Sequence, residues 1–496
     1  MLTPHRRDSL IEWMKNMLHH SFVLDLLDET APHTFEHFEN LIEEHRLVDS
    51  AASGGRTSKL RQLVPTVGEF HTNLPLKRAF LFYDSKYRVT ARRHVTISFN
   101  EIRQILNLSQ VMALCGDGKG VDDGVGSATN SECGSADENL QIQTDGAGKK
   151  TFVGPGLVTF DGDQTLYSDG GNFDSNPKLA RALALLLKNN VSIAVVTAAG
   201  YEYEAQKYAL RLSGLLNYFK EKGLSEEECS RFYVMGGECN FLLRLNKDCE
   251  LEAVTETGPG GWITATKHLK DSPGNWSEES VTKLLDVAYE SLTDSLRDMK
   301  VKGRVIRKKR AVGLIPIDKA VIPREVLDEF VLRVQSALYE KSSELSELPY
   351  CAFNGGSDVW VDVGNKRVGV EILQTYLGLP PEKTLHIGDQ FLNTGNDYAA
   401  RGCSPCAWIT SPVETTYILK RLLIFAGGID IETQGVNGMA ALTPVLTKRR
   451  KSLDTVSDLK GMHKRNSLDE SDPTVVDGIM DVYTGEIVPK KRKNRT

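Results

Sequence analysis

The sequence has no long apolar run and no large surplus of charge of either sign. No hydrophobic stretch approaches the roughly 18 residues that a membrane-spanning helix needs. The N-terminus lacks the continuous apolar segment of a signal peptide. With 60 lysines and arginines against 66 acidic residues, the net charge is -6, which argues against a dedicated nucleic-acid-binding protein. We therefore expect a soluble, cytoplasmic protein with neither membrane nor nucleic acid as a partner.

The eight cysteines follow no disulfide framework. Cys403 and Cys406 form a C-x-x-C motif, but no second pair stands at a spacing that completes a zinc site. Two interpretations remain, a redox dithiol or buried reduced thiols of an intracellular protein. The second is favoured, because cytosolic proteins seldom keep disulfides.

Composition divides the 496 residues into regions. Residues 1–115 predict a mainly helical N-terminal region, in which we expect 79–98 to contain extended segments before another helix. Residues 116–149 are rich in Gly, Ser, Asp and Asn and predict a disordered insert, because they cannot bury enough apolar surface to offset their ordering entropy. The charged tail at 448–496 is expected to be disordered as well.

From residue 150 the pattern becomes that of an α/β fold. The apolar run 157–160 predicts a strand, and Asn176 and Pro177 are typical of a helix start. The run 191–197 is apolar on both faces, as in a parallel sheet. We predict a doubly wound core formed by 150–205 and 350–435, with an inserted α+β cap domain at 206–349.

Four polar motifs occur in order along this core: FDGDQT, VVT, GNKRVGV and HIGDQF. All but the third directly follow an apolar strand, and the carboxyl ends of parallel strands share one edge of a sheet, where ligands bind. We therefore expect Asp161, Asp163, Thr197, Lys366 and Asp389 to converge there. Each motif is common by itself, and it is the ordered set that predicts a site.

These residue types suit phosphoryl transfer. Asp161 is the predicted nucleophile, and Asp163 is the predicted general acid and base. Thr197 is expected to bind a phosphoryl oxygen, and Lys366 to offset negative charge as a point cation. Magnesium prefers oxygen ligands, and we predict Asp161, Asp163 and Asp389 as its ligands.

The motifs resemble the haloacid dehalogenase superfamily of phosphohydrolases, with Asp161, Asp163 and Thr165 matching its D-x-D-x-T motif. A long stretch separates Thr197 from Lys366, and that resembles members with a cap inserted between the second and third motifs. One departure is Asn393, which stands where many members carry a second acid. Asp397 follows later in the sequence, and we expect it to contact the metal ligands and not the metal itself.

A narrower resemblance is to the IMP-specific 5′-nucleotidase family. It is carried by FDGDQTLYSDGGNF, NGGSDVWVDVGNKRVGV, LHIGDQFLNTGNDYAAR and the N-terminal MLTPHRRDSLIEWMK. The resemblance implies magnesium-dependent hydrolysis of inosine 5′-monophosphate (IMP) to inosine and phosphate in purine salvage. It also implies activation by ATP at a separate site and a homotetramer.

On this reading Asp169 and Ser357 become candidates for substrate contact, and Trp262 a candidate for the base pocket. Turn chemistry explains Asp169 and Ser357 equally well. Two alternatives stay open: a sugar-phosphate phosphatase or phosphomutase, and a non-catalytic regulatory protein. The latter draws on the basic tail, in which PKKRK resembles a nuclear-import signal.

Overall fold

The computed structural model describes residues 8–23, 27–50, 57–116, 152–318, 320–342, 345, 348–432, 478–480 and 487–489. The chain divides into two units, 1–431 and 432–496. The predicted disordered insert at 116–149 lies outside the described residues except for Gly116, as does most of the predicted disordered tail. Among the described helices, none has both the length and the apolar character needed to cross a bilayer.

The N-terminal region is helical, as predicted. Ser58 caps the third helix by accepting from the Arg61 amide, and Ser98 and Glu101 form a capping box at the start of the fifth. The helices are α1 (Ser9–Val23), α2 (Leu27–Ser50), α3 (Lys59–Leu63), α4 (Leu76–Tyr87) and α5 (Phe99–Leu114). Their apolar faces join one large core cluster with the rest of this unit.

Helix α4 corrects the prediction of extended segments between 79 and 98, because its residues 79–87 are helical. The aromatic residues of this stretch favour strands by propensity. However, Leu76, Ala79, Phe80 and Tyr83 are buried at helical spacing, on one face. Tertiary packing of that face outweighs the local preference for strand.

The core is a seven-stranded sheet in the order β11-β10-β1-β2-β3-β4-β5. The first five of these strands run parallel, and β4 and β5 continue the sheet as an antiparallel extension. The strands are β1 (Leu157–Phe160), β2 (Ser192–Thr197), β3 (Phe232–Gly236), β4 (Phe241–Leu245), β5 (Leu251–Ala253), β10 (Thr384–Gly388) and β11 (Cys406–Trp408). The predicted α/β core with a parallel sheet is therefore confirmed.

Helices cover both faces of this sheet, because alternate strand residues are apolar on opposite sides. Val158 and Phe160 belong to the large cluster, whereas Leu157 packs with Val368 and Trp262 in a separate one. Outside the cap, the described helices that follow β1 in the chain are α6 (Pro177–Lys188), α7 (Ala205–Arg211), α8 (Ser213–Glu221), α9 (Glu226–Cys229), α10 (Trp262–Thr266), α13 (Lys366–Leu377) and α14 (Pro412–Gly427). Short 3-10 turns are η1 (Pro273–Asn275), η2 (Pro381–Lys383) and η3 (Tyr398–Gly402).

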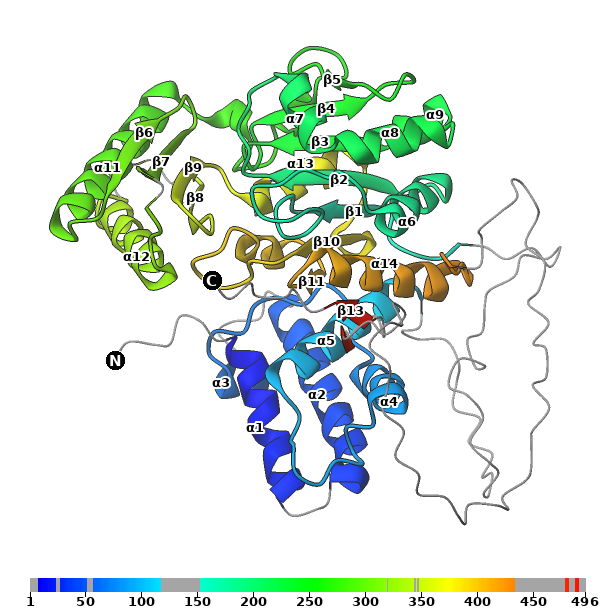
Figure 1. The fold of residues 1–496 in the computed structure, drawn as a ribbon. Helices are drawn as coiled ribbons and strands as arrows, with labels where there is room; N and C mark the ends of the chain where they lie inside the picture. Colours follow the sequence, from blue (N-terminus) through cyan, green and yellow to red (C-terminus); the bar gives the residue numbers. More distant parts are fainter. Residues whose placement is uncertain are drawn as a thin grey trace, which may run out of the picture. The chain divides into compact units, whose positions relative to one another are not determined.

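A second sheet, antiparallel and of four strands in the order β6-β7-β9-β8, has its own hydrophobic core and forms the cap. Figure 1 shows β7 and β9, which come from distant parts of the chain, side by side. The cap elements are β6 (Gly303–Arg307), β7 (Ala311–Pro316), β8 (Tyr350–Asn354), β9 (Val359–Val363), α11 (Glu278–Asp298) and α12 (Arg324–Glu340).

Sheet membership differs from the predicted domain boundaries at both ends of the cap. Strands β3, β4 and β5 belong to the core sheet although they lie within the predicted cap range 206–349. Strands β8 and β9 belong to the cap sheet although they lie within the predicted core range 350–435. A single strand's hydrophobicity does not reveal which of two sheets it pairs with, and that ambiguity explains both differences.

In the unit 432–496, the described residues form one small antiparallel pair. Strands β12 (Gly478–Met480) and β13 (Ile487–Pro489) pair with each other. These short strands fall within the predicted disordered tail and differ from that prediction.

Candidate active site

Asp161 directly follows β1, which lies between β10 and β2 in the core sheet. Its amide donates to the Ile387 carbonyl at the end of β10, so the backbone is fixed in the sheet. The residue is only 5% exposed. Burial raises the pKa of the Asp161 carboxyl to about 7, against the opposing effect of the Lys366 charge. A rigidly aimed, buried carboxylate is suited to act as a nucleophile.

Lys366 is the first residue of α13 and is fully buried. Asn365 caps the helix by accepting from the Val368 amide, so the lysine is placed where the helix begins. Its Nζ lies 2.6 Å from Asp161 Oδ1 and 2.6 Å from Asp397 Oδ1. Burial opposes the lysine's charge, but the two carboxylates raise its pKa above the usual range. The site therefore holds a fixed cation beside the Asp161 carboxylate.

Asp161, Asp389 and Asp397 form an acidic cluster whose nearest carboxylate oxygens all lie within 4.8 Å of one another. Asp389 follows β10, and its Oδ1 is buried without a hydrogen-bond partner among the described residues. Burial raises the pKa of Asp389 well above its usual range, and the charges of Asp161 and Asp397 add to this. A hard divalent cation fits this oxygen-only arrangement and would balance its charge.

Asp397 has both carboxylate oxygens occupied by protein groups. Lys366 and His386 contact Oδ1 at 2.6 and 3.0 Å, and the Gln390 amide donates to Oδ2 at 2.8 Å. Although burial acts the other way, Lys366 and His386 lower the pKa of Asp397 below its usual range. Asp161 and Asp389 are therefore the better candidates for direct metal contact. Asp397 instead fixes the positions of the neighbouring groups that it contacts.

Asp163 does not join the acidic cluster. The Arg211 guanidinium contacts both of its carboxylate oxygens at 2.8 Å, and the Gly170 amide donates to Oδ1 at 2.9 Å. Arg211 ends helix α7 and was not predicted from the sequence. A basic residue in the last turn of a helix is ordinary helix chemistry, so the sequence gives no signal of this contact.

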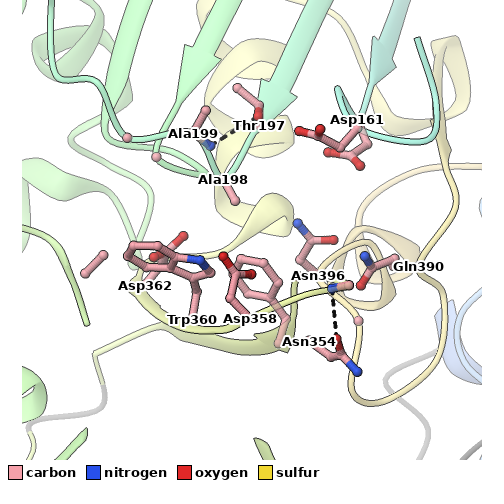
Figure 2. A pocket seen from close by; sticks show the side chains of 18 of the residues that line it. Asp161, Thr197, Ala198, Ala199, Asn354, Asp358, Trp360, Asp362, Gln390 and Asn396 are labelled. Atoms are coloured by element: carbon pink, nitrogen blue, oxygen red, sulfur yellow. Dashed lines mark hydrogen bonds between the residues drawn. The ribbon is translucent and has the colours of Figure 1, made fainter. Parts of the chain in front are cut away.

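Thr197, predicted to bind a phosphoryl oxygen, and Thr165, which matches the D-x-D-x-T motif, have different surroundings. Thr197 ends β2 and is 5% exposed, and its Oγ1 accepts from the Ala199 amide at 3.1 Å (Figure 2). Thr165 is fully buried, and its carbonyl accepts from the Thr415 hydroxyl. Thr197 thus lies at the same sheet edge as Asp161, whereas Thr165 ties the loop after β1 to helix α14.

A cavity of about 660 Å³ lies above this sheet edge, between core and cap. Figure 2 shows Asp161 and Thr197 on one side and Trp360, Asp358 and Asp362 across from them. The predicted residues that line it are Asp161, Asp163, Asp169, Thr197, Ser357 and Asp389. Lys366 lies beneath the cavity, fully buried and in contact with Asp161. The structure therefore brings these seven predicted residues to one region.

Asp169 and Ser357 lie on two loops that approach each other at the cavity. A Cβ added at Gly356 would meet Asp169 Oδ2 at 2.9 Å, and Gly356 has a φ of +93°. Only glycine adopts this conformation at low cost. The pair of glycines before Ser357 thus allows the cap loop to come close to the loop after β1.

Trp262 differs from its prediction, because it is fully buried in the cluster beneath α13. Trp262 is not among the described residues that line the cavity, whose tryptophans are Trp360 and Trp408. Lys308 lies 4.3 Å from the centre of the Trp360 ring. Asp362, on the same strand β9, also faces the cavity, and burial raises its pKa to about 7. In the sequence, the acid within the apolar run VWVDV is the feature that could have indicated that this strand faces a cavity.

Comparisons with known proteins agree on one family. The family described as IMP-specific 5′-nucleotidase matches residues 1–419. A relative with that name from Yarrowia lipolytica is 38% identical over 443 residues, covering 85% of this chain and 95% of its own length. One from Neurospora crassa is 36% identical over 460 residues, covering 86% and 97%.

Solved structures of Plasmodium falciparum IMP-nucleotidase are similar to this chain as well. An N-terminally truncated form with IMP bound is 33% identical, covers 84% of this chain and 96% of its own, and has a TM-score of 0.70. A form with ATP bound is 33% identical, covers 84% and 85%, and has a TM-score of 0.67.

Proposed function

The chain belongs to the IMP-specific 5′-nucleotidase family, and from this premise we propose that it hydrolyses IMP through a covalent phosphate on Asp161. The chemistry proposed is that of a magnesium-dependent phosphomonoesterase. The observation that carries the proposal is the meeting of Asp161, Lys366 and Asp389 at the floor of the cavity.

In the proposed first step, a carboxylate oxygen of Asp161 attacks the phosphorus of IMP. The bond between phosphorus and the ribose 5′-oxygen breaks, and its electron pair leaves with that oxygen. Asp163 gives a proton to the departing inosine. Because both Asp163 oxygens contact Arg211 in this structure, the proton transfer requires that contact to loosen.

In the second step, Asp163 takes a proton from water, and the water oxygen attacks the phosphorus of the phosphorylated Asp161. Phosphate leaves, and the Asp161 carboxylate is restored. Lys366 stabilises negative charge on Asp161 and on the phosphoryl group throughout. A magnesium ion bound by Asp161 and Asp389 would let the carboxylate and the phosphate approach each other.

We assign the preference for a nucleotide substrate to residues on the cap side of the cavity. Trp360 offers a flat apolar surface, and Asp362 a polar group, at the end away from Asp161 (Figure 2). An aromatic side chain and a few polar groups are the usual elements of a nucleoside pocket. The P. falciparum relative with IMP bound supports the same substrate here.

Phosphate release tests the proposed substrate and the cation together. The screen compares IMP, GMP, AMP and several sugar phosphates, with magnesium and after its removal by EDTA. The highest kcat/KM is expected for IMP, with activity lost in EDTA and restored by magnesium. Preference for a sugar phosphate would contradict the nucleotide assignment, and full activity in EDTA would contradict the cation.

We further propose ATP binding at a second site, a homotetramer and a cytoplasmic location. The P. falciparum relative with ATP bound supports the first of these. Light scattering of the full chain with and without ATP checks the assembly. Phosphate release at subsaturating IMP, with a non-hydrolysable ATP analogue added, checks activation. Imaging of the full chain and of a form lacking 433–496 checks the location.

A further inference from the structure

Helix α5 is joined to β11, the terminal strand of the core sheet in the described part of the chain. Asn107 donates to the Trp408 carbonyl at 2.7 Å and accepts from the Trp408 amide at 2.9 Å. Its side-chain amide therefore occupies the position that a neighbouring strand would take. Arg103 also donates to the Trp408 carbonyl. The backbone of Trp408 is thus fixed by the N-terminal helical region.

The side chain of Trp408 reaches the proposed metal site. Its indole Nε1 donates to the Asp389 carbonyl at 2.9 Å. The ring centre lies 5.7 Å from that of Phe99, which is edge-on, 6.3 Å from that of Phe391, and 5.9 Å from the Arg401 guanidinium carbon. Trp408 also lines the cavity. The ring has little freedom, so the hydrogen bond fixes the backbone of Asp389.

The turn that carries Asp389 is held from two sides. Trp408 binds its carbonyl, and Asp397 accepts from the next amide, that of Gln390. The Asp389 carboxylate itself keeps Oδ1 without a partner among the described residues, and that oxygen is buried. Its backbone is anchored while its carboxylate is left open, which suits a ligand held in place for a cation.

We propose that Trp408 is a positioning residue, through which helix α5 sets the place of the Asp389 carboxylate and so the affinity of the site for magnesium. This inference rests on the proposed function for the identity of the cation. It differs from that function in assigning a role to residues outside the motifs, on the N-terminal side of the core.

The test measures magnesium binding directly, by calorimetric titration of the purified full chain without substrate. Trp408→Phe keeps an aromatic ring but removes the donor to Asp389. Loss of a hydrogen bond behind a metal ligand costs about tenfold or more in affinity, and that loss is expected here. The kcat for IMP should fall at low magnesium and recover at saturating magnesium. Because Trp408 also lines the cavity, the titration without substrate is the deciding measurement.

Asn107→Asp is the second variant, because Asn107 is outside the cavity lining and the change is nearly isosteric. It removes one of the two donors to the Trp408 carbonyl and leaves that of Arg103, and weaker magnesium binding is again expected. Trp13→Phe is the matched control. It changes Trp13 of the N-terminal helical region, which packs on Phe38, and this variant should bind magnesium like the unmodified chain.

Several outcomes overturn the inference. They are unchanged magnesium affinity in folded Trp408→Phe, an equal loss in Trp13→Phe, and no magnesium binding by the unmodified chain. If Trp408→Phe does not fold, Asn107→Asp decides in the same way. Magnesium binding that depends on Trp408 in a chain that does not hydrolyse IMP would support the inference while contradicting the proposed function.

Discussion

At the scale of single residues, the site consists of acids whose charged forms are destabilised by burial and a lysine whose positive charge offsets that effect. Lys366 is fully buried between Asp161 and Asp397. An unpaired buried charge costs several kcal/mol, so each member depends on the others. Such a cluster is poorly suited to stability alone, and its strongly shifted pKa values are typical of functional sites.

Asp161→Asn should abolish turnover and keep the fold. The amide is nearly isosteric with the carboxylate, and Lys366 retains Asp397 as a partner. Removing a nucleophile lowers kcat by at least roughly a thousandfold. Phosphate release and the melting temperature are the measurements. Asp294→Asn, at an exposed helix position, is the matched control and should be fully active. Wild-type turnover by Asp161→Asn would exclude the assigned nucleophile.

Magnesium should raise the melting temperature of the unmodified chain, and Asp389→Asn should remove this response. The charges of Asp161 and Asp397 raise the pKa of Asp389 in the absence of a cation, so binding relieves repulsion. At a hundred times the dissociation constant, binding stabilises by about 2.7 kcal/mol. Without metal, Asp389→Asn should be at least as stable as the unmodified chain. A full magnesium response in Asp389→Asn would place the cation elsewhere.

The same carboxyls predict a dependence on pH. The folded pKa of Asp161 is raised from 3.8 to about 7 by burial. Its contribution to stability is therefore present below the unfolded pKa and is lost as the pH rises through the folded one. The metal-free chain should lose stability between about pH 4 and 7, whereas magnesium affinity should increase, because binding needs ionised carboxylates. Melting scans with and without magnesium across this range check both trends.

The sequence predicted those site residues that strand ends and motif order specify. Asp161 and Asp389 each follow an apolar strand, Thr197 ends one, and the parallel sheet brings all three to one edge. Arg211 was missed, because nothing in a helix's last turn says which loop it will meet. Trp262 was a candidate for the base pocket but is fully buried at the start of a short helix, because the sequence around a tryptophan does not say whether its ring packs in the core or lines a cavity.

At the scale of elements, a buried ion pair joins the N-terminal helices to the core. Arg103 on α5 and Glu414 on α14 are 2% and 3% exposed. Glu414 also accepts from Gln104 and from the amide and hydroxyl of Thr410. These elements are distant in sequence, and the spacing of charges along the chain gives no indication of the pairing. The contact is visible only in the folded chain.

Glu414→Gln should destabilise the protein by about 3 kcal/mol, because it leaves the Arg103 charge buried without its partner. Urea unfolding measures the change in the free energy of unfolding. The control is Glu279→Gln, in the exposed pair with Lys283, where little or no loss is expected because solvent screens an exposed ion pair. Equal effects of the two substitutions would contradict the assigned role of the buried pair.

The same scale explains the errors in the predicted boundaries. Strands β3 and β8 are both short and apolar, yet β3 pairs with β2 in the core and β8 with β9 in the cap. Pairing partners are set by tertiary contacts that a hydrophobic run does not encode. The sequence therefore predicted the existence of core and cap, and the structure was needed to divide the strands between them.

At the scale of the whole molecule, the family match ends at residue 419 and the first unit at 431. This unit contains the cavity, the acidic cluster and three hydrophobic clusters. It has the elements that the proposed reaction uses. The basic clusters that suggested a regulatory protein lie outside it, in the tail.

Removal of residues 433–496 should leave kcat/KM for IMP and the melting temperature unchanged, because none of the proposed catalytic groups lies there. Phosphate release and thermal unfolding of the truncated and full chains make the comparison. A large loss of activity at equal melting temperature would show that the tail takes part in catalysis.

The covalent phosphate on Asp161 is the central claim, and acid-quenched single turnover tests it most directly. The full chain is mixed with IMP and magnesium, quenched within one turnover, reduced with borohydride and digested for mass spectrometry. Reduction converts a phosphorylated aspartate to homoserine, and we predict that product at position 161. Homoserine at another aspartate, or inosine release with no modified residue in the first turnover, would contradict the account.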